Sequence, residues 1–208
     1  MARVWRGVLL CAAGILSVAT DGGAINSALS ESDIARALKI ATESEQVRAR
    51  FHAPYVIPVN DSTIERVEVI TEFRRYVMST EEQVKLGNWI LAQGGTGLSG
   101  RGIKDMVRPW KGRVSVRTRL RFHPQNTYGD IPPIETLVGD PPIAALDVIR
   151  TPITTPASGP KPGAQTLLGA IIEAVFDAAS LGRSSEPIRI LINGQEIKRL
   201  TVDYSRLE

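Results

Sequence analysis

The clearest alternation of hydrophobic and polar residues runs from Gly112 to His123. Successive side chains of a strand point to opposite faces, so a period of two indicates a strand with one buried face. We therefore predict a strand over 112–123. The residues expected on its buried face are Val114, Val116, Thr118, Leu120 and Phe122.

Two further segments show strand-like patterning. The stretch from Ile64 to Val77 alternates apolar and charged residues, which predicts a long strand. Near the C-terminus, 187–192 and 195–204 flank Asn193-Gly194, the residue pair favoured in two-residue type I′ hairpins. The sequence therefore predicts a hairpin at the end of the chain.

Helical periodicity is strongest near the start of the chain. Apolar residues from Ser30 to Arg50 recur on one side, and Ser30 with Asp33 three positions later resembles a capping box. A second helix is predicted over 80–93, capped by Ser79 or Thr80 and ended by Gly94-Gly95. A strand over 88–92 is the alternative for the end of that segment.

The remaining segments are less regular. Eight of the 13 prolines lie between positions 132 and 162, which favours edge strands and extended loops, with a strand within 144–155. The apolar run 166–181 fits a buried helix or a buried strand equally well, because periodicity does not separate the two. We expect a β-rich α+β fold: a mostly antiparallel sheet or sandwich with one or two covering helices.

The first 24 residues have the layout of a secretory signal peptide. Arg3 and Arg6 precede about a dozen apolar or small residues, and small residues follow at a signal-peptidase spacing. The run is shorter than the ~20 residues of a spanning helix, although an uncleaved anchor is the competing interpretation. We expect a secreted or periplasmic protein with no later transmembrane span and, since Cys11 is the only cysteine, no disulfide.

The rest of the chain, 25–208, is long enough for an ordinary hydrophobic core. We expect it to form a single β-rich domain, with a subdivision in the Pro/Gly-rich stretch near 156–165 left open. The formal net charge of +3 is too small to indicate a polyanionic partner by itself.

The stretch Gly95–Gly100 spells G-x-G-x-x-G but does not predict a dinucleotide site. That motif needs a strand before it, a crossover helix after it and an acidic residue about 20 positions later. Here a predicted helix precedes it, and the later segment is rich in arginine. We expect no cofactor. With two histidines and no cysteine outside the first 24 residues, we expect no metal site.

The polar face of the predicted strand 112–123 is the first candidate binding surface. A basic ridge of this kind can follow a polyanion. The alternative is a ladder of ion pairs with acidic residues of the 64–77 strand, namely Glu65, Glu68 and Glu72. The residues of the candidate anion-binding face are Arg113, Arg117, Arg119, Arg121 and His123.

The second candidate is the polar loop that follows, with Gln125, Asn126 and Tyr128. It supplies hydrogen-bonding groups for a ligand or a partner, or serves as a turn between strands.

No catalytic constellation is evident. The sequence favours a non-enzymatic binding or structural module of the cell envelope or extracellular space, with a protein or envelope partner. The alternatives are a polyanion-binding protein and a hydrolase that depends on His52 or His123.

Overall fold

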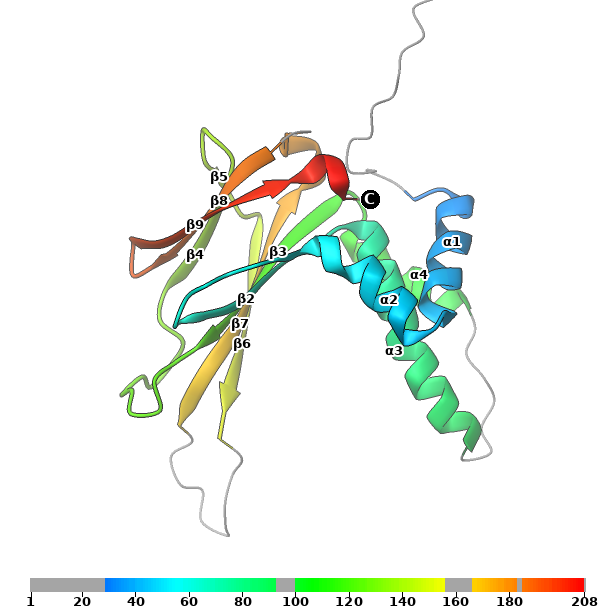
Figure 1. Ribbon diagram of the computed structural model, residues 1–208, viewed down its shortest axis with the longest axis horizontal. Coiled ribbons are helices and arrows are strands. Elements are labelled where there is room, and N and C mark those ends of the chain that lie inside the picture. Colours follow the sequence, from blue (N-terminus) through cyan, green and yellow to red (C-terminus); the bar gives the residue numbers. More distant parts are fainter. Residues whose placement is uncertain (1–28, 93–99, 156–165, 183–184, 208) are drawn as a thin grey trace, which may run out of the picture.

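The computed structural model describes residues 29–92, 100–155, 166–182 and 185–207. The predicted signal peptide lies outside the described residues. Within them the chain forms three layers: a group of helices, a five-stranded sheet and a four-stranded sheet (Figure 1). Both sheets are antiparallel, so the predicted β-rich α+β fold is confirmed, with more helix than expected.

The five-stranded sheet is the middle layer and has the order β1-β2-β3-β7-β6. Strand β3 is the one predicted from the arginine-rich alternation, and it pairs with β7 along its whole length, from Arg113 opposite Asp177 to Arg121 opposite Gly169. The bounds are β1 (Val56–Ile57), β2 (Ile64–Ile70), β3 (Arg113–Arg121), β6 (Asp147–Thr154) and β7 (Leu167–Asp177).

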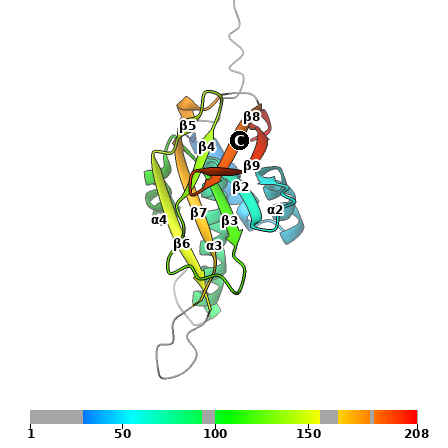
Figure 2. The same ribbon diagram turned by 90° about the vertical axis from the view of Figure 1, so that its left-hand side faces the viewer.

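The four-stranded sheet lies in front in Figure 2 and has the order β5-β4-β8-β9. The predicted hairpin joins its last two strands: Asn193 and Gly194 both have positive φ values, 52° and 77°, as a type I′ turn requires. The bounds are β4 (Ile134–Val138), β5 (Ile143–Ala144), β8 (Ser185–Ile192) and β9 (Gln195–Asp203).

The larger hydrophobic core lies between the two sheets. One apolar face of each strand is turned into it, as the period of two predicts. Its fully buried members include Val67, Val116, Leu120, Ile172 and Phe176 from the five-stranded sheet and Ile134, Val138, Ile188 and Ile190 from the four-stranded sheet.

The helices are α1 (Glu31–Thr42), α2 (Glu45–His52), α3 (Glu72–Ala92) and α4 (Gly100–Val107). The predicted capping box is present: the Ser30 hydroxyl accepts from the backbone N–H of Asp33, whose carboxylate accepts from the N–H of Ser30. The single helix predicted over 30–50 is instead two helices. The break falls where Glu43 is extended and Ser44 precedes the second helix.

The strand predicted over 64–77 is wrong beyond Ile70. Thr71 ends the strand and caps α3, because its hydroxyl accepts from the N–H of Arg74 at 3.2 Å. Helix α3 begins at Glu72 and covers the predicted helix from Thr80 to Ala92, while residue 93 lies outside the described residues. The alternative strand over 88–92 is wrong. Phe73, Tyr76 and Val77 are buried on one side of α3 at helical spacing, where they pack with Ala37 and Ala41 of α1 in a second, smaller core.

The ambiguous segment 166–181 is mainly strand β7. It lies between β3 and β6, and most of its residues are buried, on both faces of the sheet. A strand covered on both faces has no need for polar residues at alternate positions, which explains the continuous apolar run. In the segment 144–155, the predicted strand is β6.

We predict that the Gly169→Ala substitution destabilises the protein by about 1–3 kcal/mol, because a Cβ at this position would overlap the backbone carbonyl oxygen of Leu120 on β3. Urea unfolding measures the effect. Gly129→Ala is the matched control, since a Cβ there would meet nothing within 4 Å. Equal stability of the two variants would contradict the close pairing of β3 and β7.

Candidate functional site

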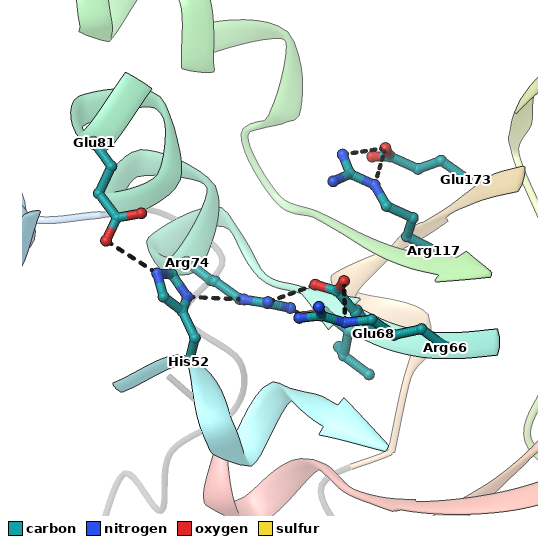
Figure 3. Close-up of polar contacts among 8 residues, drawn as sticks. His52, Arg66, Glu68, Arg74, Glu81, Arg117 and Glu173 are labelled. Carbon is teal, nitrogen blue, oxygen red and sulfur yellow. Dashed lines mark hydrogen bonds and ion pairs between the residues drawn. The ribbon is translucent and has the colours of Figure 1, made fainter. Parts of the chain in front are cut away.

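The first turn of α3 places two consecutive arginines against the polar face of the five-stranded sheet. Arg74 is only 2% exposed, so its charge needs partners inside the protein. Its Nη2 donates to Glu68 Oε2 of β2 at 2.6 Å (Figure 3). Its Nη1 donates to the carbonyl oxygen of Val69 at 2.6 Å. The arginine therefore fixes the start of α3 to β2.

His52, at the end of α2, extends this contact into a chain of polar groups. Arg74 Nε donates to His52 Nδ1 at 3.3 Å, and His52 Nε2 lies 3.2 Å from Glu81 Oε1 on α3 (Figure 3). An acceptor at Nδ1 requires the ring proton at Nε2, which then donates to Glu81. Both ring nitrogens are engaged, so in this geometry His52 positions Arg74 and neither nitrogen is free to act as a base.

Glu173 on β7 forms the second buried charge cluster. Arg117 donates to Glu173 Oε2 from Nε at 3.1 Å and from Nη2 at 2.8 Å, and Arg75 contacts the other carboxylate oxygen. Arg75 also donates to Ser115 Oγ at 2.9 Å. Burial of Glu173 opposes its ionisation, but Arg75 and Arg117 together outweigh burial and hold the pKa of the carboxyl below its usual range.

The arginines of β3 therefore have different surroundings. Arg117 forms an ion pair with Glu173. Arg119 and Arg121 instead share the single carboxylate of Glu65 on β2, at 3.1 Å and 3.7 Å. Arg113 lies at the opposite end of the strand, about 27 Å from Arg121 along an extended chain, and has no ion pair with the described residues.

The expected ion-pair ladder is present only in part. Glu65 pairs with two arginines of β3, as expected. Glu68 faces Arg117 in the strand register but bonds to Arg66 and Arg74 instead. Glu72 belongs to α3 and accepts from the N–H of Gly112 at 2.9 Å.

A cavity of about 390 Å³ lies at the end of β3, beside Arg119 and Arg121. We call it the arginine cavity. The two arginines are 47% and 68% exposed in their side chains, so both reach solvent. Its lining also includes Glu65, Leu120, Phe122, Pro124, Ile153 and Leu168. The lining therefore combines two guanidinium groups, one carboxylate and an apolar wall.

The polar loop borders this cavity through Phe122 and Pro124. The Asn126 amide holds the loop in place by donating to the carbonyl oxygens of His123 and Leu167, at 2.6 Å and 2.8 Å. The ring of Tyr128 packs edge-on against Phe122, with the centroids 5.2 Å apart.

The exposed side chains of His123 and Gln125 lie in the same loop, and His123 Nδ1 accepts from the N–H of Gln125 at 3.2 Å. The structure thus brings the two candidate regions of the sequence, the end of the arginine face and the polar loop, to one end of the five-stranded sheet.

Three expectations of absence, of a dinucleotide site, a metal site and a transmembrane span, are compared only with the described residues. Most of the Gly95–Gly100 stretch lies outside the described residues, and Gly100 is the first residue of α4. Within the described ranges, no group of three or more His, Cys, Asp or Glu side chains is arranged to hold a metal ion. Within the same ranges, no helix is long and apolar enough to cross a membrane.

Sequence reasoning did not identify Arg74, Arg75 and Glu173 as a group. Glu173 carries a signal of its own, because it interrupts an apolar run that is otherwise buried. A charge in such a run requires a partner, and two consecutive arginines in one helical turn are suitable candidates.

We predict that Arg74→Met lowers the free energy of unfolding by about 2–3 kcal/mol, because the part-buried Glu68 carboxylate and His52 imidazole lose their shared donor. Arg119→Met is the matched control: it removes a half-exposed partner of Glu65 and is expected to cost about 1 kcal/mol or less. Urea denaturation measures both. A similar loss of unfolding free energy in the two variants would show that Arg74 does not fix the start of α3 to β2.

We also predict a pH-dependent difference between Glu173→Gln and the wild type. The folded pKa of Glu173 lies below its unfolded value near 4.5, so the stability from its ionisation is fully present above that pH. This stability is lost as the pH falls through the folded pKa, so the excess in unfolding free energy of the wild type over Glu173→Gln should shrink as the pH is lowered from about 6 to below 4.5. Urea unfolding across this range tests it. Glu135→Gln, at an exposed carboxylate of β4, should parallel the wild type throughout.

Comparisons of this chain with protein-family models, with curated proteins and with solved structures found no significant match. The fold class alone does not determine a function, because one architecture supports many. The functional conclusion therefore rests on the chemistry of the site.

Proposed function

We propose that this protein is a non-enzymatic, exported binding module that takes an anionic group of a partner or envelope component at the arginine cavity. The observation that carries the proposal is the pair Arg119 and Arg121, which share one carboxylate beside a cavity of about 390 Å³. Export is proposed from the signal-like pattern of the first 24 residues.

The charge balance at the cavity favours an anion. Two guanidinium groups face one carboxylate, so the cluster has a local charge of +1 before any ligand binds. Guanidinium groups are planar donors that match carboxylate, sulfate and phosphate oxygens well. An entering anionic group can bond to both arginines and leave Glu65, which is itself partly exposed, to water.

The position of the two arginines also supports binding. They lie two residues apart on one face of β3, which separates their Cα atoms by about 7 Å and lets both contact one group or two adjacent groups. By contrast, Arg117 is committed to a buried carboxylate. The apolar wall formed by Phe122, Ile153 and Leu168 gives the ligand a non-polar contact as well.

We expect the wild-type protein to be retained on a sulfated polysaccharide matrix such as heparin at low salt. Its retention should weaken as the salt concentration rises, because salt screens the exposed charges. The double variant Arg119→Ser, Arg121→Ser should elute at clearly lower salt. The matched control, Arg113→Ser with Arg150→Ser, removes the same charge from exposed sites outside the cavity and should elute like the wild type.

Two results would contradict the proposal. Equal elution of both double variants would show that retention follows net charge and not the cavity. Wild-type protein that is not retained at low salt would show that the arginine cavity does not bind this class of anion. The ion pairs of Arg119 and Arg121 are exposed to solvent and contribute little to stability, so replacing both arginines should leave the fold intact. Circular dichroism of the double variant verifies this.

A further inference from the structure

Three neighbouring strands place an arginine, a glycine and an isoleucine in one row at the arginine cavity. Arg121 of β3 lies opposite Gly169 of β7, and Gly169 in turn lies opposite Ile153 of β6. Residues that lie directly opposite each other in an antiparallel sheet share a face, so Arg121 and Ile153 project from the same face. Both residues belong to the lining of the cavity.

The middle position of this row carries no side chain. Arg121 and Ile153 are two strand spacings apart, which is about 9–10 Å, and any side chain at Gly169 would stand between them. Even an alanine does not fit at Gly169, because its Cβ would overlap the carbonyl oxygen of Leu120. The close pairing of β3 and β7 therefore keeps the space between the arginine and the isoleucine free of a β7 side chain.

The charged and apolar parts of the lining belong to different strands. Glu65, Arg119 and Arg121 are contributed by β2 and β3, whereas the half-buried Ile153 and Leu168 are contributed by β6 and β7. Among the described residues, β6 and β7 add no charged side chain to the lining. The cavity is therefore amphipathic, with its charges toward β2 and an apolar surface toward β6.

The charge and the volume of the cavity both restrict the ligand. Two guanidinium groups and one carboxylate give a local charge of +1, which a single negative charge on the ligand balances. The volume of about 390 Å³ lies in the range of small-molecule sites and exceeds what an inorganic anion fills. The remaining space borders the apolar surface, so it suits an apolar group attached to the anion.

We propose that the arginine cavity binds a monoanionic amphiphile, which is a molecule with one negatively charged head group and an apolar chain. The head group accepts hydrogen bonds from Arg119 and Arg121, and the chain passes over Gly169 to contact Ile153. This inference rests on the proposed function, because it uses the same two arginines, and it adds the chemical class of the ligand. A membrane lipid and a free amphiphile share this chemistry.

Titration calorimetry on the full chain with hexyl sulfate and methyl sulfate tests the proposal. The two probes have the same head group and differ by five methylene groups, each of which strengthens binding about fourfold when fully buried. Because the cavity is open to solvent and buries only part of the chain, we expect hexyl sulfate to bind the wild type about tenfold more tightly or better. Hexan-1-ol, which has no charge, should not bind measurably, and Arg119→Ser with Arg121→Ser should lose both sulfates.

A pair of matched variants of β6 tests the position of the chain. Ile153→Thr removes apolar surface from the cavity and should lower the ratio of hexyl sulfate to methyl sulfate affinity severalfold. Ile149→Thr is the control, since Ile149 lies on the same face of the same strand, is 41% exposed and does not line the cavity. The affinity ratio of this control should equal that of the wild type.

The amphiphile proposal is overturned if hexyl sulfate binds no more tightly than methyl sulfate, if hexan-1-ol binds equally well, or if the two β6 variants have the same affinity ratio. Heparin retention reports on the proposed function separately. Retention that depends on Arg119 and Arg121 without any effect of chain length would overturn the amphiphile alone, whereas absence of retention would count against the anion site itself.

Sedimentation with vesicles distinguishes the two sources of the ligand. If the ligand is a membrane lipid, the wild type should sediment with phosphatidylglycerol vesicles, whose head group carries one negative charge, and not with phosphatidylcholine vesicles. Binding of hexyl sulfate without sedimentation on either vesicle would support a free amphiphile as the ligand.

Discussion

The structure depends on neutralising a row of charges that crosses the middle sheet. Glu68, Arg117 and Glu173 are neighbours in the register of β2, β3 and β7, on the face turned toward the helices. Helices placed over this face remove water from part of the row, and charges that lose water need counter-charges. Arg74 and Arg75, at the start of α3, supply them.

This requirement explains the position of α3. Thr71 turns the chain at the end of β2, so the first helical turn returns over the strand that precedes it. The two arginines then reach two different carboxylates, Glu68 on β2 and Glu173 on β7, and span the sheet between them. His52 and Glu81 add a link between α2 and α3, so the helical layer is held to the sheet by directed polar contacts as well as by apolar packing.

The same requirement separates structural charges from those available for binding. Arg117 lies near the helices and is bound by Glu173, whereas Arg119 and Arg121 lie farther along β3 and keep large exposed fractions. A charge in water costs little to maintain and can exchange its partner for a ligand. The arginine cavity is therefore located where the sheet continues beyond the charges that the helices neutralise.

By itself, the sequence determined the elements whose signals are local. The alternation over 112–123, the Asn193-Gly194 turn and the capping box at Ser30 each depend on residues only a few positions apart, and the structure has all three. The basic face of β3 was also evident, since the period of two assigns residues to faces without any tertiary information.

Tertiary structure decided the features that depend on distant partners. The segment 71–77 fits both a strand and a helix, and the contacts of Phe73, Tyr76 and Val77 with α1 favour the helix. Segment 166–181 became a strand because it pairs with β3 on one side and β6 on the other. The positions of Glu65, Glu173 and the helical layer decide which arginine of β3 forms a buried ion pair and which stays exposed. The reason is that the free energy of a charge is set by its surroundings in space and not by its neighbours in sequence.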